Sequence, residues 1–330
     1  MQTPATSLTI PAVDKPPRRR RWIPVSVRMF VVMVVVLGAC CAWRCIRGYQ
    51  QLVAIREIEE LNPIVETTPT GPRWLRSLVG SETMLMFDEV KVIIFEDTPA
   101  NDATLRHLGH LPDLKWLSLR NTQVTDAGLI HLKRMTSLEQ LWLEGTRVTD
   151  SGLASLTGLR NLKELELDET DVTDAGLVHL KGLTELTHLS FNKTRVTDAG
   201  LVYLKGLTRL ESLLLCDTQV SAIGVAHLIG LPRLQVLFLI NTQVDDAALE
   251  HLKGLTNLRK LWLSQTRVTD AGLRNLKGLA NLKWLSLDET QVSDAGIAEL
   301  KGASPKLVIW TGIPASEKQE SRPIGNSLTH

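Results

Sequence analysis

The chain repeats itself with a period of 24 residues. Two units, LKELELDETDVTDAGLVHLKGLTE over 162–185 and LRKLWLSQTRVTDAGLRNLKGLAN over 258–281, place leucine, threonine and aspartate at the same positions. Eight consecutive units fill 114–305 without an insertion, a weaker copy precedes them over 90–113, and KLVIWT over 306–311 resembles one more strand. A unit this short cannot bury its own leucines, so the units must stack on one another.

Each unit has two halves with different hydrophobic periods. The first half, L-x-x-L-x-L, ends in the alternation that a short strand with one buried face requires. The second half, G-L-x-x-L-x-x-L, has the three-residue period of a helical turn, and the Thr-Asp pair between the halves favours a helix cap. We therefore predict an α/β solenoid over 90–311, with about nine repeats and a terminal strand. A curved parallel β-sheet would form its concave side and short helices its convex side.

The motif LxxLxLxxT followed by VTDAGLxxL resembles the short leucine-rich-repeat class of bacterial proteins, related to ribonuclease-inhibitor-like and cysteine-containing repeats. Three further segments, RRRRWIPVSVRMF, QLVAIREIEEL and GPRWLRSLVG, resemble the anchor region of membrane-bound bacterial members. Threonine stands where such repeats usually have asparagine, and the resemblance implies that its hydroxyl bonds backbone groups of the same turn. These threonines are Thr98, Thr122, Thr146, Thr170, Thr194, Thr218, Thr242, Thr266 and Thr290.

An apolar segment precedes the repeats. The run MFVVMVVVLGACCAW over 29–43 has no charged residue, and adding 22–27 makes it long enough to cross a hydrocarbon core of about 30 Å. Trp22 and Trp43 fall at its two ends, where amphipathic rings prefer the headgroup level. We predict one transmembrane helix over 22–46. A cleaved signal peptide, or lipidation at Cys40, stays open as an alternative.

The basic residues around this segment predict its orientation. Six cations precede the uncharged run (Lys15, Arg18, Arg19, Arg20, Arg21 and Arg28), and three follow it (Arg44, Arg47 and Arg56). The positive-inside bias then makes 1–21 a basic cytoplasmic tail and places the repeats outside the cytoplasmic membrane. The chain would be a single-pass membrane protein.

Residues 47–89 are predicted to connect the membrane segment to the repeats. Apolar residues at helical spacing predict a helix over 49–61 that ends at Asn62-Pro63. ETTPTGP over 66–72 predicts a linker, and PRWLRSLVG over 72–80 predicts a short amphipathic helix that covers the open end of the solenoid. After the repeats, the polar stretch 312–330 predicts a disordered tail.

Side chains at the third, fifth, seventh and eighth positions of a unit are expected on the concave strand face. They include an apolar patch, which we define as Leu214, Val236, Phe238, Ile240, Trp262 and Trp284. They also include an acidic patch, which we define as Glu164, Glu166, Asp168 and Glu169, and the tryptophans Trp116 and Trp142. An apolar patch rimmed by charge indicates a partner site, and tryptophans are frequent binding anchors. Alternatively, these aromatics pack only on each other or on a tail.

Nothing in the sequence indicates catalysis or a cofactor. P-loop, GxSxG, HExxH and Cys-x-x-Cys motifs are absent, and a net charge of +1 argues against a dedicated nucleic-acid binder. A column of aspartates that Ala222 interrupts is assigned to helix capping, not calcium binding. No metal is expected either, because the histidine column offers one imidazole per unit where zinc needs three or four converging ligands. The column consists of His107, His131, His179, His227 and His251.

These patterns predict a non-catalytic, membrane-tethered recognition module. Its concave face would bind a protein, a peptide or an envelope polymer. One alternative is a cytosol-facing adaptor, like ubiquitin-ligase substrate receptors with similar TDAGL repeats. Another is a structural spacer of the cell envelope.

Overall fold

The structure is a computed structural model that describes residues 25–70, 76–78, 80–85 and 87–312. The chain divides into two units, Met1–Ile46 and Arg47–His330, which are described separately. The predicted basic tail over 1–21 lies outside the described residues. So does the predicted disordered tail, apart from Gly312.

The described part of the first unit is helical. Helix α1 (Val25–Glu59) begins there and continues into the second unit, so the predicted helix over 49–61 is the end of a longer one. Apolar side chains such as Phe30, Val35 and Leu37 are exposed along it. Within the described ranges one helix, Met29–Glu59, is long and apolar enough to cross a membrane, and a signal sequence would meet the same criterion.

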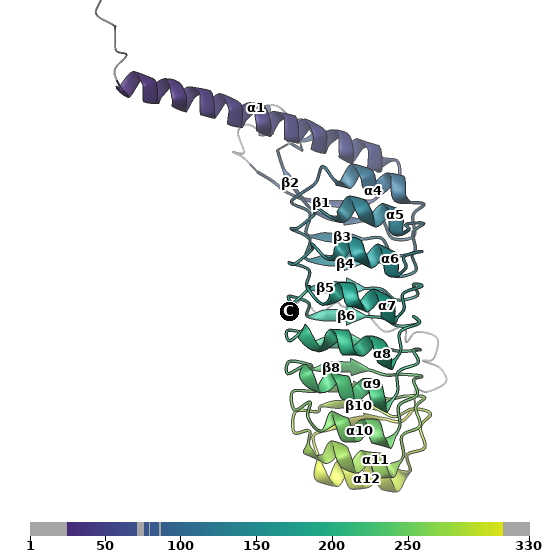
Figure 1. Cartoon of the computed structure of the whole chain (residues 1–330). Helices are drawn as coiled ribbons and strands as arrows, with labels where there is room; N and C mark the ends of the chain where they lie inside the picture. Colours follow the sequence, from purple (N-terminus) through teal and green to yellow (C-terminus); the bar gives the residue numbers. More distant parts are fainter. Residues whose placement is uncertain (1–24, 71–75, 79, 86, 313–330) are drawn as a thin grey trace, which may run out of the picture. The chain divides into compact units, whose positions relative to one another are not determined.

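The second unit is built on a sheet whose strands follow each other in chain order (Figure 1). From β2 onward all neighbours are parallel, and residues 24 apart in the sequence lie opposite each other, as Leu213, Leu237 and Leu261 do. The strands are β1 (Ile64–Thr68), β2 (Glu89–Ile94), β3 (Trp116–Ser118), β4 (Gln140–Trp142), β5 (Glu164–Glu166), β6 (His188–Ser190), β7 (Ser212–Leu214), β8 (Val236–Phe238), β9 (Lys260–Trp262), β10 (Trp284–Ser286) and β11 (Val308–Trp310).

Short helices stack beside one another on one side of this sheet (Figure 1). They are α4 (Asp102–Leu108), α5 (Asp126–Leu129), α6 (Asp150–Leu153), α7 (Asp174–Leu177), α8 (Asp198–Leu201), α9 (Ala222–His227), α10 (Asp246–Leu252), α11 (Asp270–Leu273) and α12 (Asp294–Ala303); α3 (Ser81–Met84) precedes the repeats. Single 3-10 turns extend six of them: η1 (Ile130–Leu132), η2 (Ala154–Leu156), η3 (Val178–Leu180), η4 (Val202–Gly206), η5 (Leu228–Gly230) and η6 (Arg274–Gly278). The curved parallel sheet with helices in every repeat confirms the predicted solenoid.

The leucines of successive units form one continuous core between sheet and helices. In the unit 162–185, Leu165 on the strand, Leu167 directly after it and Leu177 on the helix are fully buried. The ninth-position threonine closes the turn after the strand, because the Thr170 hydroxyl donates to the carbonyl of Leu167 at 2.6 Å. The other eight threonines make the same bond, which confirms the turn role that the resemblance implied.

The N-terminal end of the solenoid is covered by two segments for which the sequence predicts other roles. Ala54, Ile55 and Ile58 of α1 are buried in the same core as the repeats. Strand β1 pairs antiparallel with β2 and covers its edge. The predicted linker is therefore wrong for 66–68, where β-branched residues continue a strand. The predicted cap helix over 72–80 lies outside the described residues except 76–78 and 80, of which 76–78 are helical.

Aspartates at the first helical position join most repeats to the next. The two carboxylate oxygens of Asp150 accept from the backbone N–H and the hydroxyl of Thr173, at 2.8 and 2.6 Å. Thr173 in turn caps α7 by accepting from the N–H of Ala175. Capping by threonine is thus confirmed, whereas the aspartate bonds the following repeat and does not cap its own helix. We call this pair of bonds the aspartate clamp. It recurs at Asp102–Thr125, Asp126–Thr149, Asp174–Thr197, Asp198–Ser221, Asp246–Thr269 and Asp270–Ser293.

The clamp requires a glycine in the following repeat. A Cβ atom on Gly176 would meet Oδ1 of Asp150, and it would lie 2.9 Å from Cδ1 of Leu153. Where Ala222 replaces the aspartate, the next repeat has Ala248 in place of the glycine and Asp245 in place of the capping threonine. Asp245 caps α10 with its own carboxylate. The three departures occur together because all three residues meet at one junction.

Candidate functional site

The parallel register brings the predicted apolar patch together on strands β7 to β10. Leu214 lies opposite Phe238, and Phe238 lies opposite Trp262. In the neighbouring column Val236 lies opposite Lys260, and Lys260 lies opposite Trp284. The patch is therefore continuous over four strands, with one lysine inside it.

The aromatic rings of the patch pack on each other and remain accessible. Phe238 and Trp262 stack with their ring centroids 4.2 Å apart and their planes 11° from parallel. The Lys260 ammonium lies 5.3 Å from the centroid of Trp284, whose side chain is 38% exposed. The remaining members of the patch are half-buried. The apolar patch is thus a preformed surface on which each aromatic ring already packs against one neighbouring side chain.

A second aromatic pair lies on β3 and β4. Trp116 and Trp142 meet edge to face with centroids 4.8 Å apart, and the Arg120 guanidinium lies 5.3 Å from the Trp142 centroid. The indole N–H groups of both tryptophans are buried, and neither has a hydrogen-bond partner among the residues that the structure describes. Two strands separate this pair from β7, so Trp142 is not part of the apolar patch.

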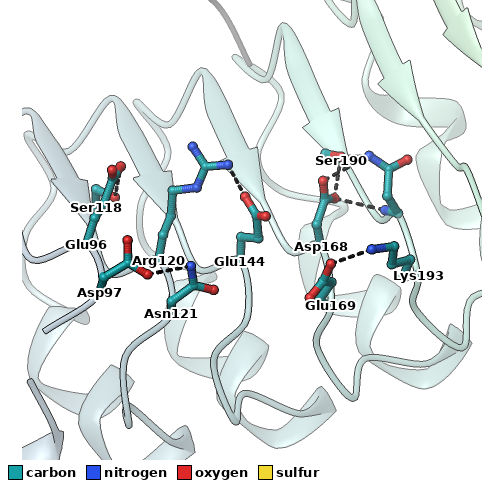
Figure 2. A network of polar contacts seen from close by, with 11 residues as sticks. Glu96, Asp97, Ser118, Arg120, Asn121, Glu144, Asp168, Glu169, Ser190 and Lys193 are labelled. Carbon is teal, nitrogen blue, oxygen red and sulfur yellow. Dashed lines mark hydrogen bonds and ion pairs between the residues drawn. The ribbon is translucent and has the colours of Figure 1, made fainter. Parts of the chain in front are cut away.

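Two members of the acidic patch, Asp168 and Glu169, belong to a network of polar contacts in the turn after β5 (Figure 2). Asp168 accepts from the Ser190 hydroxyl and from the backbone and side-chain N–H groups of Asn192, both at 2.9 Å. Burial raises the pKa of Asp168, although these bonds oppose the shift. Glu169 instead pairs with Lys193 at 2.6 Å, on the exposed side of the turn.

Glu166 has the most perturbed carboxyl of this patch. Burial raises its pKa to about 7, repulsion from Asp168, Glu144 and Glu164 adds to the shift, and Arg120 opposes it. Arg120 is itself ion-paired with Glu144 (Figure 2). At neutral pH the Glu166 carboxyl therefore exists in both protonation states, and a cationic group placed beside it would favour the charged one.

Side chains that could bind a metal do not cluster in the described ranges. No group of three or more histidine, cysteine, aspartate or glutamate side chains there could hold a metal ion. Cys216, which follows β7, is half-buried, and burial raises the pKa of its thiol to about 12. Its neutral thiol is a weak nucleophile.

A polar hollow lies at the edge where the strands begin, away from the positions that the sequence predicts for a site. It is lined by Arg233, Gln235, Asn257, Arg259 and Asn281. All five side chains come from the last position of one repeat or the second position of the next. Both columns can be read from the sequence, but polar side chains at such positions are typical of any solvent-facing edge.

Comparison with known proteins identifies the repeat class. A family described as Leucine Rich repeat matches residues 158–180. The solved structure of an internalin C2 from Listeria monocytogenes is 28% identical, with a TM-score of 0.49, over 63% of this chain and 84% of that one. A leucine-rich-repeat protein from Leptospira interrogans is 21% identical, with a TM-score of 0.49, over 62% of this chain and 56% of that one.

An internalin (inlF) from Listeria monocytogenes is 17% identical, with a TM-score of 0.29, over 73% of this chain and 94% of that one. No curated protein sequence matches this chain. The repeated motif and the parallel strand ladder, together with the match over 158–180, give this chain the leucine-rich-repeat fold.

Proposed function

We propose that this chain is a non-catalytic recognition module, tethered to a membrane, that binds a protein, a peptide or an envelope polymer on its concave face. The apolar patch is the observation that supports this proposal most strongly. Packed aromatic side chains that keep a face in water are stabilised further when a partner covers them. Stacked repeats also provide an extended surface of the kind that solenoid proteins use for binding.

The tether would be the predicted transmembrane segment over 22–46, of which the structure describes 25–46 as part of α1. Its exposed valines and Leu37 are unfavourable in water and suit a bilayer core. The excess of cations before the run supports a cytoplasmic N-terminus and repeats outside the cytoplasmic membrane.

Phe238 and Trp262 are the proposed central anchors, because each is rigid, half-buried and stacked on the other. Trp142, backed by Trp116, would provide a second anchor nearer the N-terminal end. The acidic patch between the two aromatic groups would select a ligand segment that carries a basic residue there. An extended ligand that runs across the strands could meet all three features.

Site-specific photocrosslinking tests this proposal and requires no candidate ligand. A photoreactive amino acid would replace Ser286, which borders the apolar patch, in the full chain expressed in its own cells. The control would replace Ala154, which is exposed on the helical side. We expect a discrete, saturable adduct from position 286 alone, and a loss of about tenfold or more with Phe238→Ala and Trp262→Ala combined.

The same experiment contains the results that would contradict the proposal. An adduct that survives alanine at Trp142, Phe238 and Trp262 together would place the binding site elsewhere. If neither concave nor helical positions gave a saturable adduct, the spacer hypothesis would replace the recognition hypothesis. Circular dichroism of each variant would show that the repeats remain folded.

A further inference from the structure

The edge of the solenoid where the strands begin has a regular pattern of ion pairs in its N-terminal half. In the second-position column, Lys115 and Lys163 each lie 2.6 Å from a different carboxylate oxygen of Glu139. In the last-position column, Arg209 pairs with Glu185. Each of these cations is thus neutralised by an acid in a neighbouring repeat.

The pattern changes at the polar hollow. Arg233 and Arg259 have no acidic partner among the residues that the structure describes, and the five lining side chains include no carboxylate. The nearest acid of the second-position column is Glu211, which lies one repeat before Gln235 and two before Arg259 and does not line the hollow. The hollow therefore has an uncompensated positive charge.

The walls of the hollow are held in place by the backbone. The side-chain amide of Asn257 donates to the carbonyl of Pro232 at 2.7 Å, and that of Asn281 donates to the carbonyl of Thr256 at 2.8 Å. These bonds fix the loops from which Arg233 and Arg259 extend. Arg233 and Arg259 are themselves exposed, so both guanidinium groups are accessible to a ligand from solvent.

We propose that this hollow binds an oxyanion, a phosphate or carboxylate group, through Arg233 and Arg259. A guanidinium is charged at every physiological pH, and its planar fork matches two oxygens of such a group. Two arginines at one hollow repel each other, and an anion between them replaces repulsion by charge-assisted hydrogen bonds. The Gln235 amide could supply one more donor. The site lies on the strand edge and is independent of the apolar patch and its partner.

Phosphorus NMR of inorganic phosphate tests the proposal on the full chain in a non-ionic detergent at constant ionic strength. We expect phosphate line broadening that saturates in the millimolar range and a loss of about tenfold or more in affinity for the double variant Arg233→Gln, Arg259→Gln. The matched control is Lys115→Gln, Lys163→Gln, which removes two cations from the same edge where each has an acidic partner. This control should bind phosphate as the unaltered chain does.

Acetate provides a second arm. If acetate displaces phosphate, the hollow accepts carboxylates as well; if it does not, the site favours phosphate, and both results agree with the proposal. Equal weakening by the two double variants would instead indicate general attraction to a cationic surface and would overturn it. Unchanged binding by the Arg233, Arg259 variant would also overturn it. Neither result would affect the crosslinking test, which probes a different face.

Discussion

Each aspartate clamp couples one side chain of a repeat to two residues of the next. Asp150 bonds Thr173, and its carboxylate occupies the space that a side chain on Gly176 would need. The clamp satisfies the carboxylate and positions the threonine that caps the following helix. Sequence regularity at these three positions is thus explained by local contacts at each junction.

We expect Gly176→Ala to destabilise the repeats by about 2 kcal/mol, because a methyl group would be forced against Asp150 and Leu153. Urea unfolding followed by circular dichroism would measure the change. Ala248→Gly is the matched control, since its junction has Ala222 and no carboxylate. The control should lower the free energy of unfolding only by the difference in helix propensity between alanine and glycine, about 1 kcal/mol.

The natural junction also shows how to rescue the variant. Adding Asp150→Ala and Thr173→Asp to Gly176→Ala reproduces the set Ala222, Asp245 and Ala248. The triple variant should regain most of the lost stability, with a favourable coupling energy on the order of 1 kcal/mol. If the three changes were simply additive, the steric explanation would be wrong.

Because of the Glu166 carboxyl, the free energy of unfolding should fall as the pH rises. Its pKa rises from 4.5 to about 7 on folding, so the folded state binds more protons between these values and stability falls as pH rises through them. Glu166→Gln should therefore stabilise the chain by about 2–3 kcal/mol at pH 8 and by less than about 1 kcal/mol at pH 5. Urea unfolding at both pH values checks this, and an equal difference at both would contradict it.

At the scale of elements, the N-terminal cover of the solenoid buries the open end of the repeat core. Ile58 of α1 is fully buried in the repeat core, and β1 completes the first strand's pairing. A solenoid is stabilised mainly by contacts between neighbours, so a loss at one end affects the nearest repeats first. The cover therefore protects β2 and β3 more than distant strands.

Ile58→Ala should destabilise this end by about 2–4 kcal/mol, the usual cost of removing a large buried side chain. Hydrogen exchange followed by mass spectrometry should then show faster exchange in β2 and β3 and unchanged exchange in β9. Val53→Ala is the control, because Val53 is 37% exposed on the same helix. Uniformly faster exchange in all strands would mean that the repeats unfold as a single cooperative unit.

The elements differ in how far the sequence could predict them. The 24-residue period predicts strands, helices and register, and therefore the adjacency of Phe238 and Trp262. The partner of each aspartate was not predicted, because a column of carboxylates by itself fits capping, ion binding or a clamp equally well. The linked changes at Ala222, Asp245 and Ala248 did contain that information. Strand β1 was missed because its pairing with β2 outweighs a loop-like composition.

At the scale of the whole molecule, the proposed function and the adaptor hypothesis differ in the side of the membrane on which the repeats lie. Cys216 cannot report it, because its half-buried thiol has a pKa of about 12 and reacts slowly. Ala154→Cys, in a chain with Cys40, Cys41 and Cys45 changed to serine, places a thiol at an exposed position. A membrane-impermeant maleimide should label this introduced cysteine in intact cells. Labelling only after lysis would place the repeats in the cytoplasm.

The junction after Ala222 also limits how this array can gain or lose repeats. Removing 186–209 would leave Asp174 facing Ser221 and Gly224, a matched set. Removing 210–233 would instead set Asp198 against Asp245 and the methyl group of Ala248, so two carboxylates and a side chain would compete for one space. Removing 210–257 as one piece restores a match with Thr269 and Gly272. These two repeats therefore form a matched pair, and only their removal or duplication as one piece keeps the contacts at every junction compatible.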